Sequence, residues 1–392
     1  MGNSLITIGK GPKLQGASTL SLIAPCYFCA GILSSWLGGI WLGVRLWLTR
    51  HGILSTPVNY AELLSAHALI QIYLSLGFFL IGFCYHAVPK VLQVKINVSQ
   101  RLAWSTFLLL ILGAMLITLT PREQVGRFLL MLGYCCVSIF LVRLLLVAEK
   151  SAQLRVGLHL LVGLCVLTVG TLLNPRKPEV ALTLLWSGVG AMVFGASQQF
   201  LFAFLGCEKL RERAALRSCG FHLVAASLLL SQHFKTFGIL ALVQVFGFIF
   251  ATKSWRLLPK ILTSMGSSFA FSFFWMVVAA FCLMKDEPNY DAAVHALSLG
   301  MAYTVIIGTS SQILGFMNLK QILPERWLTL LILVWQLAVL GRVWSVWSPG
   351  NPWQVGLTGV ASSIVLLTWG AALISSALEL FQKTRRTGSF SK

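Results

Sequence analysis

Two histidines stand at matching places in two long apolar runs that lie far apart in the sequence. His67 and His295 each begin a His-Ala-Leu triplet. Glu62 and Asp291 precede them by five and four positions. Neutral imidazole is the commonest metal ligand in proteins, and two imidazoles ligate one metal ion or the two faces of a haem iron. The pair therefore predicts a cofactor between two helices, and the alternative is that each histidine lines an interfacial polar patch.

The run that follows His67 carries further polar and small residues. Gln71 lies four residues after His67, so a helix would place both side chains on one face. We therefore predict that Gln71 helps to bind the cofactor by orienting the His67 imidazole. Gly77 and Gly82 would let a flat ring approach closely, although plain helix packing explains these glycines equally well.

Arg143 lies inside another apolar run, toward its inner end. Guanidinium suits a haem propionate, so we include Arg143 among the candidate cofactor-binding residues. The competing interpretation, which we favour, is that the side chain extends to the inner lipid headgroups.

Cysteines and a third histidine suggest a site for a soft metal. Cys26-x-x-Cys29 stands in the first apolar run, and Cys84-x-His86 stands at the end of the second. Thiolate and imidazole donors suit copper(I), so His86 is a further candidate metal ligand. The alternative is that these cysteines act as small apolar residues, as expected for most of the nine cysteines in the chain.

The composition identifies the elements that must position these residues. Of 392 residues, 57% are hydrophobic and only 10% are charged, whereas soluble globular chains carry about 25% charged residues. The same values exclude intrinsic disorder. Long apolar runs must satisfy their backbone polar groups internally, which predicts an all-α polytopic membrane helix bundle. The net charge of +19 is explained by basic loops facing an anionic leaflet, so we expect no nucleic-acid partner.

We expect a cytoplasmic N-terminal segment over residues 1–18, a transmembrane domain over 19–380 and a basic cytoplasmic tail over 381–392. Each apolar run is long enough to cross a bilayer. The twelve predicted spans are 19–44, 63–88, 102–120, 127–148, 156–173, 180–206, 218–232, 234–252, 261–284, 291–317, 327–347 and 353–380. Only Ser231-Gln232-His233 separates the seventh span from the eighth.

Basic residues predict the orientation. The loops on the side of the membrane opposite to the two termini hold nine basic residues: Arg45, Arg50, Arg122, Arg127, Arg176, Lys177, Lys235, Lys285 and Arg342. The loops on the side of the termini hold about twice as many basic residues, which predicts a multi-pass membrane protein with both termini in the cytoplasm. We expect the membrane to be the inner (plasma) membrane of the cell. In this orientation His67 and His295 lie near the outer face. His86, His159 and His222 lie on the inner side.

Acidic residues, by contrast, stand outside the predicted spans or at their ends. A proton-coupled transporter usually relays protons through buried carboxylates, so their absence near the midplane argues against that function. A small apolar gas needs no polar channel, so a gas substrate would fit the lack of acidic residues near the midplane.

Three short segments resemble one membrane family. The second span runs from His67 to Ala87-Val88-Pro89, and a later segment reads His295-Ala296-Leu297-Ser298 before Gly300. The opening Ala24-Pro25-Cys26-Tyr27-Phe28 is a weaker match. On these residues the chain resembles the NnrS family, whose members are polytopic membrane proteins described as containing haem and copper and as linked to nitric oxide.

The resemblance implies haem bound by His67 and His295, leaves copper open, and implies a role in nitric oxide or denitrification-linked respiratory metabolism. The implied partners are the lipid bilayer, a small gas such as nitric oxide and a respiratory subunit. The family often shows His-x-His-Glu-Met at the second span. Ser65, Ala68 and Leu69 depart from that pattern here.

A second, weaker resemblance involves Tyr85-His86, Pro89 and Lys90, which are similar to a helix of haem-copper oxidase subunit I. An oxidase site needs an adjacent His-His pair, and none of the seven histidines forms one. We therefore expect no respiratory turnover. Two alternatives stay open: a cofactor-free secondary transporter, and a structural subunit of a respiratory complex similar to oxidase subunit I.

Overall fold

Helices form almost the whole described part of the chain. The computed structural model describes residues 22–54, 60–96, 98–119, 123–175, 177–285, 287–347 and 352–386, and these residues contain no β-strand. The predicted all-α helix bundle is therefore confirmed. The expected segment 1–18 lies outside the described residues, and the first part of the expected tail, residues 381–386, continues the last helix.

The α-helices follow one another with short connections. In chain order they are α1 (Ile23–Ser34), α2 (Leu42–Arg50), α3 (Tyr60–Leu69), α4 (Gly77–Val91), α5 (Gln100–Leu119), α6 (Glu123–Val147), α7 (Lys150–Ala152), α8 (Leu158–Gly170), α9 (Pro178–Thr183), α10 (Ala191–Leu205), α11 (Glu212–Leu230), α12 (Phe234–Thr252), α13 (Ser264–Met284), α14 (Tyr290–His295), α15 (Thr304–Asn318), α16 (Glu325–Trp344) and α17 (Pro352–Arg386).

Several spans change their winding partway along. The π-helical segments are η2 (Ser35–Trp41), η3 (Ile70–Leu76), η4 (Gln153–Gly157), η5 (Leu184–Gly190) and η7 (Ala296–Tyr303), and η6 (Ser254–Lys260) is a 3₁₀-helix. Each π segment joins two α-helices into one continuous span. Wider winding of this kind is rare and is frequently found at functional sites.

Eleven helices among the described residues are long and apolar enough to cross a membrane. The predicted run 218–232 forms the later part of α11, whose first turns carry Glu212, Arg213 and Arg217. The chain reverses between α11 and α12 at Ser231–His233, where Gln232 has a φ of 60°. The predicted separation of these two runs is therefore confirmed, and α11 is the helix that falls short in apolar character.

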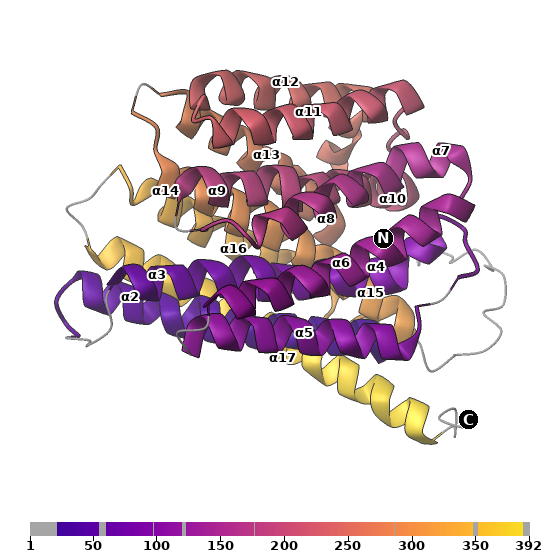
Figure 1. Cartoon of the computed structure of the whole chain (residues 1–392), viewed down its shortest axis with the longest axis horizontal. Helices are drawn as coiled ribbons and strands as arrows, with labels where there is room; N and C mark the ends of the chain where they lie inside the picture. Colours follow the sequence, from indigo (N-terminus) through magenta and orange to yellow (C-terminus); the bar gives the residue numbers. More distant parts are fainter. Residues whose placement is uncertain are drawn as a thin grey trace, which may run out of the picture.

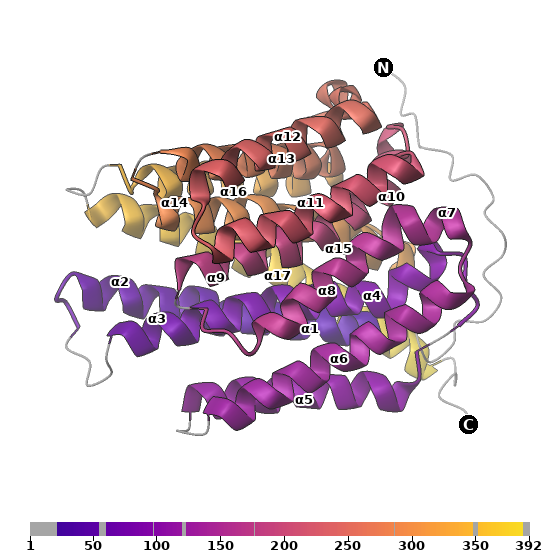
Figure 2. The same ribbon diagram turned by 45° about the horizontal axis from the view of Figure 1, so that its top comes forward.

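The helices lie roughly side by side along the long axis of the molecule (Figures 1 and 2). The three most buried spans are 60–91, 178–205 and 290–318. Polar loop residues fix where helices begin and end: Thr263 and Asn289 cap the amide groups of Gly266 and Ala292 at the start of α13 and α14. Gly206, with a φ of 70°, ends α10 in the left-handed conformation.

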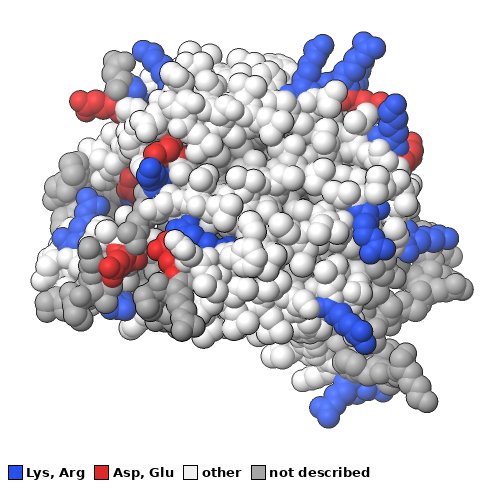
Figure 3. Space-filling view, viewed as in Figure 1, with Lys and Arg blue, Asp and Glu red and all other residues white. Residues whose placement is uncertain are grey.

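Charge is concentrated at the two ends of the helices. Figure 3 shows acidic and basic side chains at both ends of the molecule and a broad uncharged band between them. Large apolar side chains such as Ile139, Phe250 and Leu337 are exposed on the bundle. An uncharged, apolar exposed band of this extent is what a lipid bilayer would cover.

Candidate functional site

His67 lies in the last turn of α3, directly before η3. Its Nδ1 is 2.5 Å from the carbonyl oxygen of Gly38, which belongs to η2. Because a carbonyl oxygen only accepts, Nδ1 carries the proton and Nε2 keeps its lone pair. Nε2 has no hydrogen-bond partner among the described residues, so the ring is oriented by one nitrogen and able to ligate with the other.

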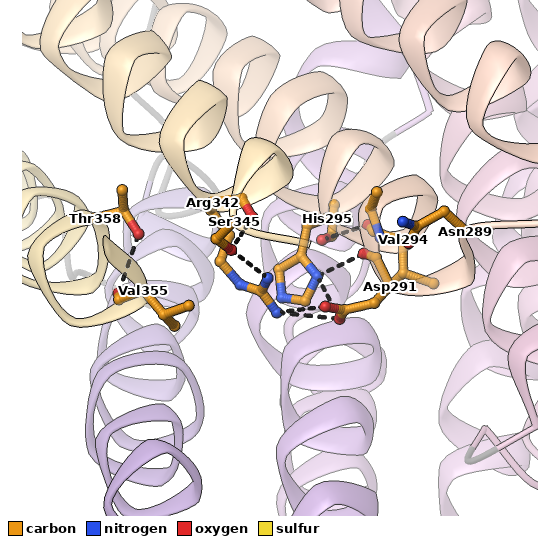
Figure 4. A network of polar contacts seen from close by, with 10 residues as sticks. Asn289, Asp291, Val294, His295, Arg342, Ser345, Val355 and Thr358 are labelled. Carbon is orange, nitrogen blue, oxygen red and sulfur yellow. Dashed lines mark hydrogen bonds and ion pairs between the residues drawn. The ribbon is translucent and has the colours of Figure 1, made fainter. Parts of the chain in front are cut away.

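His295 is held in the same way on a different span. It is the last residue of α14, and its Nδ1 is 2.8 Å from the Asp291 carbonyl oxygen and 3.1 Å from Oδ1 of the Asp291 carboxylate. Arg342 on α16 donates through Nη2 to both carboxylate oxygens, over 3.1 and 2.9 Å. Figure 4 shows the imidazole beside this ion pair, with its hydrogen bonds drawn to Nδ1. A carboxylate behind an imidazole is a common support for metal-ligating histidine.

The two histidines belong to one neighbourhood. His67 lies within electrostatic range of the His295 and Arg342 side chains. Helices α3 and α14 also lie at the same end of the bundle, on the left in Figure 1. The structure thus places two imidazoles, each anchored through Nδ1, toward one end of the bundle, although their spans are far apart in sequence. Ligation by the pair stays a prediction.

A buried polar network lies one turn farther into the bundle. The Tyr303 hydroxyl donates to Oε1 of Gln71 over 2.6 Å and contacts the Ser35 hydroxyl at 2.8 Å. These three residues come from η7, η3 and η2. The orienting group for His67 is therefore the Gly38 carbonyl, and the Gln71 oxygen bonds to Tyr303 instead of to the imidazole that we expected it to orient.

Gln71 and Ser75 each leave a buried polar atom without a hydrogen-bond partner among the described residues, namely Nε2 and Oγ. Unpaired polar atoms in a native interior call for an explanation, such as a water or a ligand that completes their bonding. The amide nitrogen of Gln71 is a hydrogen-bond donor one turn below His67. This orphaned donor agrees with a bound group that carries an acceptor.

His86 is at the other end of the same span. It lies 19 residues beyond His67, which corresponds to about 28 Å along a helix. Its Nε2 is 2.9 Å from Nζ of Lys90. His86 therefore does not join the His67 pair.

Arg143 lies on α6 with an exposed side chain and no polar contact among the described residues. The side chain is on the outer surface of the bundle rather than in its interior. This position agrees with an arginine that extends along lipid toward the headgroups, the interpretation favoured from the sequence.

The cysteines provide no third ligand at the candidate site. Cys26 and Cys29 are partly buried on α1, and Cys84 is buried on α4. Within the described residues no group of three or more His, Cys, Asp and Glu side chains could hold a metal ion. Copper(I) binding by these cysteines stays a prediction.

Sequence reasoning did not identify Tyr303, Ser35 or the role of Arg342. From the sequence, Arg342 contributes only to the excess of basic residues in loops that predicts the orientation. Its role could have been suspected only from Asp291, because a carboxylate near the start of an apolar run needs a cationic partner. Tyr303 and Ser35 carry no spacing signal, because their contacts arise from π segments that shift side chains around the helix.

Taken together, the fold and these residues define a multi-pass membrane helix bundle with a supported imidazole pair near one end. The NnrS protein family model matches residues 24–383, so the chain belongs to the NnrS family. The resemblance stated from the second and tenth spans is therefore confirmed.

Comparison with solved structures gives the same architecture. A chain from a haem-copper terminal oxidase dimer, determined by cryo-electron microscopy, matches with a TM-score of 0.70 and 13% identity. The match covers 93% of this chain and 85% of that chain. The weaker resemblance to haem-copper oxidases thus extends to the whole fold. No curated protein matches the sequence.

Proposed function

We propose that this protein is a membrane haem protein in which His67 and His295 would hold the haem iron. The supporting observation is that both imidazoles are anchored through Nδ1 and keep Nε2 without a partner among the described residues. Membership of the NnrS family and the oxidase-like fold agree with a haem-type function. The donor set fits haem, because the porphyrin supplies four ligands and the protein needs to supply only two.

In this proposal the protein residues hold and tune the site. Gly38 fixes the His67 ring. Asp291 accepts a hydrogen bond from Nδ1–H of His295, which makes Nε2 of that ring a more basic metal ligand. Arg342 holds the Asp291 carboxylate in place through hydrogen bonds to both of its oxygens. A bound haem would supply an iron that exchanges electrons, and a small gas would bind to that iron only when one of the two imidazoles is displaced.

We further propose that the ligand is nitric oxide or a related small gas, in denitrification-linked respiratory metabolism, with copper as a second metal. The lack of charged side chains in the middle of the spans supports an apolar substrate, which crosses a hydrophobic bundle without a polar path. We place the protein in the inner (plasma) membrane, and the excess of basic residues on one side supports cytoplasmic termini. Reporter fusions at both termini would test the orientation.

The visible absorption spectrum of detergent-purified protein tests the haem proposal. We expect a Soret band in the wild type and its loss in His67→Ala and in His295→Ala. Added imidazole should restore the band in each variant, since the free base can occupy the vacated position. Rescue of this kind separates lost ligation from misfolding.

His233→Ala is the matched control, because His233 lies in the turn before α12 and its side chain is exposed. This variant should keep the wild-type spectrum. A colourless wild-type protein, expressed with haem available, would contradict the proposal and favour a cofactor-free transporter. A Soret band unchanged in both histidine variants would place the haem elsewhere.

A further inference from the structure

A second pair of histidines meets in the interior, on helices that do not carry His67 or His295. His159 is on α8 and His222 is on α11, and both side chains are fully buried. Their ring centroids are 6.1 Å apart, and their planes are 82° apart. Two polar rings in contact inside an apolar bundle need a reason to be there, because each carries two nitrogen atoms that require partners.

The hydrogen bonds of this pair leave ring nitrogens free. His159 donates through Nδ1 to the Arg155 carbonyl oxygen over 3.1 Å, and its Nε2 has no partner among the described residues. Neither nitrogen of His222 makes a hydrogen bond with the described residues. A neutral His222 ring carries a proton on one nitrogen and a lone pair on the other. One lone pair on each ring is then available.

The surroundings exclude most other partners. The Phe194 ring lies against His222 with centroids 5.2 Å apart. A methyl group added at Gly195 would be 3.1 Å from Cβ of His159, so α10 closes over this side. No carboxylate or thiol completes a group of three potential ligands within the described residues. The site therefore offers two neutral nitrogen donors and no negative charge.

We propose that His159 and His222 bind one copper(I) ion between them. Zinc prefers four ligands, whereas the monovalent closed-shell copper ion accepts two donors in a line and carries less charge into an apolar interior. A linear nitrogen–metal–nitrogen arrangement with bonds of about 2.0 Å would put the two ring centroids about 6 Å apart, and the observed separation is 6.1 Å. Rotation about the nitrogen–metal–nitrogen axis permits the angle between the ring planes. This site would hold the copper of the proposed function but does not require haem at His67 and His295.

The test is a copper(I) titration of the full-length, detergent-purified protein under anaerobic, reducing conditions against a coloured chelator such as bicinchoninate. We expect the wild type to take one ion at this site, and His159→Leu and His222→Leu to bind it at least tenfold more weakly. X-ray absorption of the loaded wild type should show two nitrogen neighbours.

His222→Met separates ligation from folding, because Met and Leu have similar volume and apolarity while only Met carries a soft sulfur donor. We expect His222→Met to retain copper(I) and to replace one nitrogen neighbour by sulfur. His233→Leu, in the turn before α12, is the control that should bind as the wild type does. The Soret band recorded on the same samples reports separately on the haem proposal.

Three results would overturn the inference. The first is that the wild type binds no copper(I), which would mean that water alone satisfies the hydrogen bonds of the two rings. The second is equal binding by the wild type and both leucine variants. The third is loss of binding in His222→Met as well as in His222→Leu while both remain folded.

Discussion

The Tyr303 hydroxyl donates to Oε1 of Gln71 over 2.6 Å and so joins two residues that are 232 positions apart in the chain. Both belong to π-helical segments, and Ser35 of a third π segment contacts the same hydroxyl at 2.8 Å. Tyr303 is 1% exposed. The three widened spans are therefore tied together by polar contacts in the interior, one helical turn from the His67 ring.

Removal of this hydroxyl should destabilise the bundle. In Tyr303→Phe the Gln71 oxygen loses its donor inside the protein, and an unsatisfied buried acceptor costs about 1–3 kcal/mol. We expect a matching fall in the free energy of unfolding in mixed detergent. Tyr60→Phe changes an exposed side chain and should leave that free energy within about 0.5 kcal/mol of the wild type. Equal stabilities of the two variants would mean that the network contributes nothing.

Asp291→Asn should weaken haem binding without abolishing it. The amide keeps the shape of the side chain but removes the charge that faces Nδ1 of His295 and the Arg342 guanidinium. Loss of such a supporting group typically costs about 10–100-fold in affinity. Haem titration followed at the Soret band measures this change. Glu62→Gln is the matched control near His67, because Glu62 is exposed, and a loss as large as that of Asp291→Asn would contradict the assigned role.

Helices α5 and α6 pack through two glycines that face one another. A methyl group added at Gly113 would lie 2.7 Å from the Gly126 carbonyl oxygen, which is too close for the helices to keep their separation. Gly113→Ala should therefore destabilise the protein by about 1–3 kcal/mol. Gly220→Ala on α11 meets no atom within 4 Å and should be neutral or stabilising by up to about 1 kcal/mol. Thermal unfolding of both variants under identical conditions makes the comparison.

The contact between Glu208 and Lys253 should make stability depend on pH. The hydrogen bond from Lys253 lowers the pKa of Glu208, helped by the charges of Lys253, Arg256 and Arg211. The contribution is present above the ordinary carboxyl pKa of about 4.3 and is lost as the pH falls through the lower pKa of the folded state. We expect Glu208→Gln to be less stable than the wild type at neutral pH, with the difference fading in acid.

Lys253→Met should give the same profile, because it removes the other partner. Unfolding temperatures measured between pH 3 and pH 7 provide the comparison. A difference between Glu208→Gln and the wild type that does not change with pH would show that the contact does not titrate as described.

The spans could be predicted closely from the sequence, because a bilayer demands long apolar helices whatever their packing. The expected run 63–88 became the helix 60–91, and the junction at Ser231–His233 was found where it was expected. The run at 218–232 illustrates the limit of hydropathy: Arg213 and Arg217 lower the apolar character of α11, yet it is a full helix in the bundle.

The candidate site was predicted only in part. His67 and His295 were selected by their depth and by their common triplet, and both lie toward one end of the bundle. The support for each ring was not predictable in detail. Gly38 contributes a carbonyl, which no side-chain pattern reveals, and Gln71 turns to Tyr303 because the π segments change which residues share a face.

The uncharged band in Figure 3 has an electrical consequence. A transmembrane voltage falls across such an insulating layer, and each elementary charge that crosses it exchanges about 2.3 kcal/mol per 100 mV. A redox centre held by His67 and His295 would lie near one face of the membrane, at one edge of the layer across which the voltage falls. Electrons delivered from the adjacent aqueous phase would cross little of the voltage, and electrons from the opposite phase would cross most of it. The side of the electron donor thus determines whether membrane energisation would speed or slow the reduction of such a centre.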